Sequence, residues 1–162
     1  MIDESSLDGA RLRRVLGAFP SGVTAVAALV DGRPAGLAAN SFTSVSLDPP
    51  LVSICIAHSS RTWRRLRSAA RCGISVLAAD QEQVCRQLAT SNADKFVGLD
   101  WHATTHGAVL MQGAPAWFEC SVEQQIPAGD HDIVLLRIHD LGVEQTVRPL
   151  VFHGSRFHQL AP

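Results

Sequence analysis

Apolar and β-branched residues in this chain occur in runs of strand length that are separated by turn residues. One run covers Val23–Val30, the next covers Arg33–Asn40, and only Asp31-Gly32 lies between them. An Asp-Gly pair between two such runs is a strong signal of a β-hairpin, because both residues tolerate positive φ. A third apolar run, Leu51–Ala57, follows the break at Asp48-Pro49-Pro50. The pattern therefore predicts short strands joined by tight turns.

The other segments extend this pattern and add a few short helices. Apolar spacing and capping residues predict helices over Asp8–Phe19, with Asp8 as N-cap, and over Asp80–Thr90, with Asp80 as N-cap. Ser59 or Ser60 is predicted to cap a third helix that carries Trp63, Leu66 and Ala70. Further strands are predicted over Ser41–Leu47, Cys72–Ala78, Ala116–Ile126, His131–Val143 and Leu150–His153, with Ser91–Pro115 irregular.

These strands do not alternate regularly with crossover helices, which disfavours a doubly wound parallel sheet. We expect a mainly β fold, a small antiparallel barrel with short flanking helices. A barrel of this size fills its lumen with side chains, so a large ligand would bind on its outer wall or at a subunit interface. The length of 162 residues predicts a single domain over residues 1–162.

The composition narrows the class of protein. A formal net charge of −1 argues against a general nucleic-acid binder or a polybasic membrane protein. No apolar run reaches the roughly 20 residues of a transmembrane helix, and Met1–Asp8 lacks the features of a signal peptide. The four cysteines lie far apart, with no CxxC pair, as expected for free thiols in a reducing compartment. We therefore expect a cytoplasmic protein that binds neither nucleic acid nor membranes.

Several well-known site motifs are absent. None of the 12 glycines forms a GxG pair, which excludes a Rossmann fingerprint and a P-loop. The chain also lacks GxSxG and HExxH motifs. His102 and His106 lie four residues apart, but no cysteine or carboxylate accompanies them at ligand spacing, so no metal site is predicted. Any nucleotide must therefore bind through other residues, in a folded or shallow mode.

The segment Gly36–Thr62 carries the most informative chemistry. Small and hydroxyl residues fill Asn40–Ser46, and Ser60-Arg61-Thr62 opens a helix one strand later. Free N–H groups, hydroxyls and a cation together suit a phosphate. Ordinary capping beside solvated arginines is the simpler interpretation. The basic stretch Arg61–Arg71 likewise fits either phosphate contacts or a solvated helix face.

Longer motifs extend through most of the chain. Phe19–Thr24 precedes the run ANSFTSVSLDPP at Ala39–Pro50, and Asp94-Lys95-Phe96, Gly129-Asp130-His131 and Pro149–Phe152 follow in order. These motifs resemble those of the flavin reductase family, the short NAD(P)H:flavin oxidoreductases that serve two-component monooxygenases. The resemblance covers about residues 10–160, and the ANSFTSVSLDPP run is its most specific part.

The resemblance implies an FMN-binding split β-barrel of Greek-key type, usually a homodimer, with FMN or FAD near the subunit interface. It implies hydride transfer from NADH or NADPH to flavin N5, followed by release of reduced flavin to a partner monooxygenase. The protein's main contribution would be positioning, since the flavin carries the chemistry. Two alternatives remain: a non-catalytic FMN carrier, and an oxidase similar to the pyridoxamine-phosphate oxidases.

Family analogy also implies roles for residues between the second and third apolar runs. Asn40 and Ser41 would hydrogen-bond the flavin ring or the ribityl chain. Ser46, Leu47 and Asp48 would line the edge of the ring through main-chain groups.

The phosphate of the cofactor is assigned to a second group of residues by the same analogy. Ser60, Arg61 and Thr62 would hold it. Lys95 and Phe96 would close over the phosphate or the ring.

His131 is the catalytic candidate that the resemblance implies, as a group that orients the nicotinamide or polarises the flavin's reactive face. A satisfied turn histidine is the alternative. The chain departs from the family pattern at three positions, where Ala38 replaces a frequent Thr, Leu136 a common Gly and Phe157 a frequent Tyr. Each departure puts individual flavin contacts in doubt.

Overall fold

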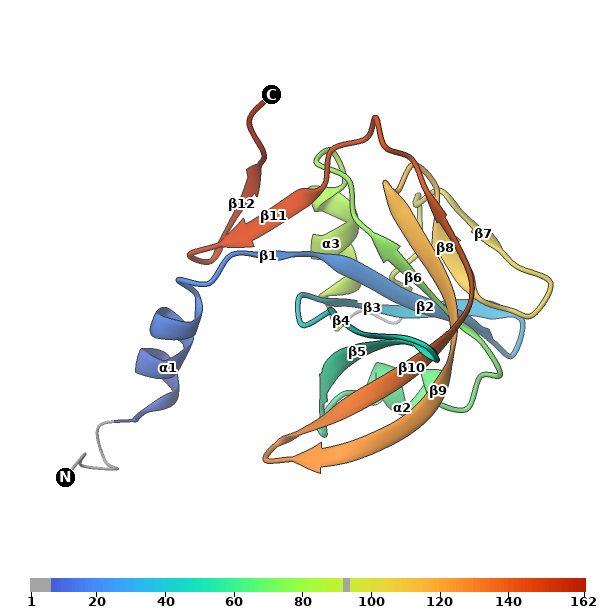
Figure 1. The fold of residues 1–162 in the computed structure, drawn as a ribbon, viewed down its shortest axis with the longest axis horizontal. Coiled ribbons are helices and arrows are strands. Elements are labelled where there is room, and N and C mark those ends of the chain that lie inside the picture. The colour runs from blue at the N-terminus through green and yellow to red at the C-terminus, as the bar shows by residue number, and fades with distance from the viewer. Residues whose placement is uncertain (1–6, 92–93) are drawn as a thin grey trace.

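The computed structural model describes residues 7–91 and 94–162. Its helices are α1 (Gly9–Leu16), α2 (Arg61–Leu66) and α3 (Glu82–Leu88). Its strands are β1 (Ser21–Gly22), β2 (Thr24–Val30), β3 (Arg33–Ala39), β4 (Thr43–Leu47), β5 (Pro50–Ala57), β6 (Cys72–Val76), β7 (Trp101–Ala103), β8 (Val109–Met111), β9 (Ala116–Ala128), β10 (His131–Val143), β11 (Leu150–His153) and β12 (Arg156–Gln159). Strands make up most of the regular structure, as predicted (Figure 1).

Seven strands form one antiparallel sheet in the order β3-β2-β6-β9-β10-β5-β4. The predicted Asp31-Gly32 hairpin joins β2 to β3 and places Val30 opposite Arg33. The sheet curls strongly, which brings β3 back beside β5 (Figure 1). The edge strands β3 and β4 do not pair with each other within the described residues, so the predicted antiparallel barrel is split along this edge.

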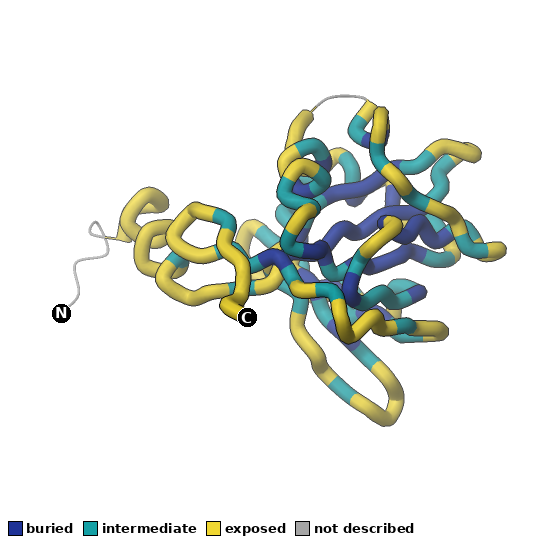
Figure 2. Tube along the Cα trace, turned by 90° about the horizontal axis from the view of Figure 1, so that it is seen from above, coloured by how far each residue is buried: buried dark blue, intermediate teal, exposed yellow. Residues whose placement is uncertain are grey.

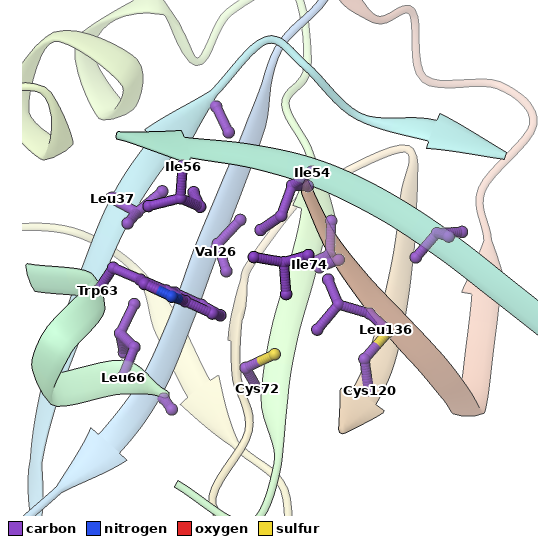
Figure 3. Close-up of a cluster of buried hydrophobic side chains, with 14 of the residues drawn as sticks. Val26, Leu37, Ile54, Ile56, Trp63, Leu66, Cys72, Ile74, Cys120 and Leu136 are labelled. Carbon is purple, nitrogen blue, oxygen red and sulfur yellow. The ribbon is translucent and has the colours of Figure 1, made fainter. Parts of the chain in front are cut away.

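Side chains fill the inside of the curled sheet. Val26, Ile74 and Leu136 are fully buried there, and Trp63 of α2 covers one end (Figure 3). The Trp63 Nε1 group donates a hydrogen bond to Gln125 Oε1 at 3.0 Å, so its polar atom is satisfied. Burial of each large side chain contributes about 1.5–3 kcal/mol. Leu136 is therefore a core residue, and its departure from the family pattern concerns packing.

A second apolar cluster covers the outer faces of β2 and β3. It includes Leu77, Leu88 of α3, Phe96, Val109 of β8 and Leu150 of β11. The segment Ser91–Pro115, predicted to be irregular, thus supplies part of the core.

The prediction of an irregular segment is wrong for β7 and β8, which pair with Trp101 opposite Met111. Strands of three residues are too short to show a period of two, and this explains the error. Residues 92 and 93 of the segment lie outside the described residues.

The helix ends also differ in part from the predictions. Asp8 caps α1 as predicted, since its Oδ1 accepts from Arg11 N at 2.7 Å, but the helix ends at Leu16. The predicted cap at Asp80 is wrong, because α3 begins at Glu82 after Gln81. The Gln81 side chain instead accepts a hydrogen bond from Ala78 N at 2.8 Å.

An exposed arm projects from the split barrel, formed by α1, β1 and the β11–β12 hairpin (Figure 2). Strand β12 was not predicted; it follows a tight turn in which Gly154 has φ 57° and Ser155 has φ 61°. No residue of α1 is buried, and its apolar Val15 and Leu16 are 63% and 69% exposed. Helices α1, α2 and α3 are all too short or too polar to cross a membrane.

Candidate functional site

A cavity of about 570 Å³, the first cavity, opens between α2, the start of β3 and the segment that follows α3. Five of the ten predicted cofactor residues lie together in its lining: Ser60, Arg61, Thr62, Lys95 and Phe96. None of its described lining residues is acidic, whereas Arg61, Arg65 and Lys95 are cationic. The lining is therefore positively charged, which favours an anionic ligand.

Helix α2 is held by its apolar side, which leaves its polar residues facing this cavity. Ser60 is the N-cap, as predicted, and its Oγ accepts from Trp63 N at 3.1 Å. Trp63 and Leu66 are buried in the core. Arg61 and Arg65, one turn apart, line the cavity, while Arg64 does not and donates to His58 O at 3.3 Å. The basic stretch is thus divided, and only Arg61 and Arg65 of its described arginines line the first cavity.

Lys95 lies at the wall of the first cavity and is partly buried. Its Nζ donates to Leu88 O at 3.0 Å, Thr62 Oγ1 at 3.2 Å and Gly36 O at 3.4 Å. Burial lowers the pKa of Lys95 below the usual value for lysine, because water no longer fully solvates the charge. The ammonium group thus joins β3, α2 and α3.

Phe96 is held against the body rather than free to move over the ligand. It is 6% exposed, and its ring meets the Trp101 ring edge-on at 6.2 Å between centroids. A Cβ at Gly36 would lie 2.8 Å from Phe96 Cζ, so only glycine allows this close packing against β3. Phe96 forms part of the cavity wall.

The remaining predicted cofactor residues lie along the end of β3 and the edge strand β4, outside the first cavity. The Ser41 hydroxyl is already used, because it accepts from Cys55 N at 2.8 Å and donates to Cys55 O at 3.2 Å. Leu47 is 92% exposed. Strand β4 pairs only with β5 in the seven-stranded sheet, so one side of its backbone is free of strand partners. The structure thus favours main-chain over Ser41 side-chain contacts.

A second cavity, of about 450 Å³, adjoins the first and shares Thr90 with it. Asn40, one of the predicted cofactor residues, lies on its wall. Ala38 and Phe157, two positions where the chain departs from the family pattern, also line it. Arg86 Cζ lies 5.0 Å from the centre of the Phe157 ring. The other lining residues, mostly apolar, are Val23, Ala39, Cys85, Ala89 and Phe152. Sequence reasoning missed this cavity, since these residue types more often form cores.

His131 lines neither cavity; it starts β10, opposite Ala57 of β5. Its Nδ1 donates to Asp130 Oδ1 at 2.7 Å, which lowers the pKa of Asp130 and leaves His131 Nε2 free of that bond. A second such pair, not predicted, joins His58 Nε2 to Asp132 Oδ1 at 2.8 Å. His58 N also donates to Asp130 O at 2.9 Å, which ties this hairpin end to the chain entering α2.

The cysteines and histidines form no metal centre in the described part of the chain, where no cluster of three or more His, Cys, Asp or Glu is arranged as ligands. Cys72, Cys85 and Cys120 are buried, Cys55 is exposed, and all four are free thiols. Burial raises the pKa of Cys72 to about 12, so this thiol is unreactive at neutral pH.

Comparisons with known proteins agree on one family. The chain is 39% identical over 157 residues to a flavin reductase from Pseudomonas putida, covering 96% of this chain and 92% of that protein. It is 34% identical over 157 residues to the reductase subunit of a flavin-dependent monooxygenase from Rhodococcus jostii, covering 97% and 80% of the two chains.

A solved structure supports the same assignment. An NADH:FAD oxidoreductase from Streptomyces globisporus, in complex with NAD and FAD fragments, matches with a TM-score of 0.91 and 39% identity, covering 100% of this chain and 97% of that one. The model of the flavin reductase like domain matches residues 16–161. With nearly the whole chain matched, the protein belongs to the flavin reductase like domain family.

Proposed function

We propose that this chain transfers a hydride from NADH or NADPH to FMN or FAD and releases the reduced flavin to a partner monooxygenase. It is an oxidoreductase that acts on flavin, as its named relatives are. The relative from Rhodococcus jostii is itself a monooxygenase reductase subunit, which supports such a partner. The observation that carries the proposal is the first cavity, which combines three cations with hydroxyl groups and has no described acidic lining residue.

The first cavity suits the phosphate end of a flavin nucleotide. Arg61 and Arg65 would neutralise its charge, and the hydroxyls of Ser60 and Thr62 would donate to its oxygens. The bound flavin supplies the hydride-accepting N5 atom, and the protein orients the two ring systems.

The ring of the flavin would lie along the outer face of β3 toward Asn40. This direction is supported by the second cavity, which continues from the first at Thr90 and is lined by Asn40. Main-chain groups of Ser46 and Leu47 at the end of β4, and of Asp48 just after it, would bond the polar edge of the ring, since one side of this edge strand has no strand partner among the described residues.

His131 would orient the nicotinamide amide from the hairpin end. Its contact with Asp130 fixes the ring and directs Nε2 away from that carboxylate. Misplacement of the reacting groups by about 1 Å can lower the reaction rate about 100-fold. His131→Ala is therefore expected to lower kcat/KM for NADH. His102→Ala, an exposed histidine on β7, is the matched control. Unchanged kcat/KM in His131→Ala would exclude this role.

We also propose a homodimer. No residue of α1 is buried, and the apolar residues Val15, Leu16 and Phe19 are 63%, 69% and 79% exposed. A second copy would cover this apolar surface. Light scattering at micromolar concentration should give twice the mass of the chain, and a monomer with flavin bound would contradict the proposal.

The activity is tested by mixing the protein with NADH or NADPH and an excess of free FMN or FAD. Loss of the NADH absorbance over many turnovers is the expected result. In air and without a partner, released reduced flavin is reoxidised by O₂, so hydrogen peroxide should accumulate. A change equal to the amount of protein, or no change, would instead indicate a flavin carrier. Oxidation of a pyridoxamine phosphate without nicotinamide nucleotide would favour the oxidase alternative.

A further inference from the structure

We propose that Lys95 is a positioning residue that fixes the Thr62 hydroxyl as a hydrogen-bond donor to the flavin phosphate, and that Lys95 does not contact the phosphate itself. The proposal rests on the proposed function, because it assumes that a flavin phosphate enters the first cavity. It replaces the expectation that Lys95 closes directly over the ligand.

The ammonium group of Lys95 has no donor left for a ligand. It carries three N–H groups, and three oxygen atoms of the protein lie within bonding distance: Leu88 O at 3.0 Å, Thr62 Oγ1 at 3.2 Å and Gly36 O at 3.4 Å. The Leu88 carbonyl belongs to the last turn of α3, where carbonyl groups lack helical partners. A direct bond to phosphate would therefore break a contact that satisfies a main-chain or hydroxyl oxygen.

The bond from Lys95 determines the direction of the Thr62 hydroxyl. Because Lys95 can only donate, the Thr62 oxygen must accept, and its own proton must point elsewhere. No acceptor for that proton is present in the described protein, and Thr62 lines the first cavity. A phosphate monoester is mostly dianionic at neutral pH and then offers only acceptor oxygens, so the Thr62 proton matches it. A hydroxyl that accepts from a cation is also a stronger donor.

The surroundings support this division of roles. Arg61 and Arg65 line the same cavity from α2 and are exposed, so their guanidinium groups can contact a phosphate directly. Lys95 lines the cavity too but is partly buried, and its hydrogen bonds join it to β3, α2 and α3. The arginines thus supply accessible charge, and Lys95 sets the geometry of one neutral donor.

A double-mutant cycle with two ligands tests the proposal. The variants are Lys95→Met, Thr62→Val and the double variant, and the ligands are FMN and riboflavin, which is FMN without its phosphate. Loss of one charge-assisted hydrogen bond should weaken FMN binding about tenfold in each single variant, with riboflavin unchanged. The double variant should lose no more than a single one, because both changes remove the same interaction. Thr62→Ser, which keeps the hydroxyl, should restore FMN affinity.

Three outcomes would overturn the proposal. If the losses of FMN affinity add, so that the double variant binds FMN about 100-fold more weakly, Lys95 and Thr62 act independently. An equal loss of riboflavin binding would show that Lys95 only supports the fold. Undiminished FMN binding by a folded Lys95→Met variant, or by Lys95→Leu if Lys95→Met does not fold, would show that Lys95 is not needed to orient Thr62. Failure of the proposed function is a separate result, because the unmodified protein would then fail to oxidise NADH or NADPH in the presence of excess free flavin. Failure of the first cavity as a phosphate site would instead show as equal affinity of the unmodified protein for FMN and riboflavin.

Discussion

The first and second cavities lie side by side on the outer face of one strand, yet they differ sharply in chemistry. Pro34–Gly36 of β3 form a wall of the first, and Ala38–Asn40 form a wall of the second. Both stretches consist mainly of small residues, so β3 itself contributes little polarity. Helix α2 with its N-cap and the segment that follows α3 supply the cations and hydroxyls of the first cavity. Helix α3 and the β11–β12 hairpin supply the apolar wall of the second. One strand of small residues thus borders two cavities of different chemistry, because different elements cover its two halves.

Charge reversal in the first cavity should give the largest effect. Arg65→Glu places a carboxylate where a phosphate is expected, so FMN affinity should fall about 100-fold while riboflavin affinity stays constant. Arg67→Glu is the matched control, since Arg67 ends α2 without lining the cavity. Fluorescence titration of the flavin measures both affinities. An equal loss of affinity for FMN and riboflavin would mean that the first cavity does not bind the phosphate specifically.

Filling the second cavity should give a smaller effect of a different kind. Ala89→Leu adds three carbons to an apolar wall, and displacement of a ring edge there should weaken FMN and riboflavin alike, by about tenfold. Val143→Ala, at an exposed position far along β10, controls for a general change of apolar surface. The same titration applies. If the affinity for FMN falls and the affinity for riboflavin does not, the second cavity does not hold the ring.

Raising the pH should reduce the preference for FMN by a few-fold. Burial lowers the pKa of Lys95, so the ammonium loses its proton at a lower pH than an ordinary lysine does. Neutral Lys95 orients Thr62 less well, so FMN affinity falls as pH rises through this pKa and is highest below it. The ratio of FMN to riboflavin affinity, measured from pH 7 to 10, removes effects on the shared ring. In Lys95→Met this ratio should stay flat; a slope equal to that of the unmodified protein would assign the titration to another group.

The sequence predicted the first cavity better than the second for a physical reason. Phosphate binding needs cations and hydroxyls, which stand out at Ser60-Arg61-Thr62 and Lys95. An apolar slot needs Val, Ala and Phe, which are indistinguishable from core residues before their neighbours are known. Phe152 and Phe157 meet only because β11 and β12 pair, and β12 was not predicted.

The same reasoning explains which other predictions held. Strong local signals, the Asp31-Gly32 hairpin and the Asp8 and Ser60 caps, are confirmed because each is satisfied within a few residues. The predicted start of α3 is wrong because the helix begins after Gln81 and not after Asp80. The Gln81 side chain bonds Ala78 N and Gln112 O and so holds the chain in place before the helix. The hydrogen bonds of Lys95 join residues 36, 62 and 88, which are far apart in the sequence, so no local pattern could predict them.

Strand β5 connects three parts of the site in fixed order. Cys55 binds the Ser41 hydroxyl, Ala57 pairs with His131, and the chain then passes through His58 to the Ser60 cap. One inserted or deleted residue within β5 would turn its side chains to the opposite face and shift all three attachments by about 3.4 Å at once. Length changes should therefore be tolerated in the exposed turn between β10 and β11 but not in β5, because β5 fixes the spacing between the residues proposed to bind the phosphate, the ring and the nicotinamide.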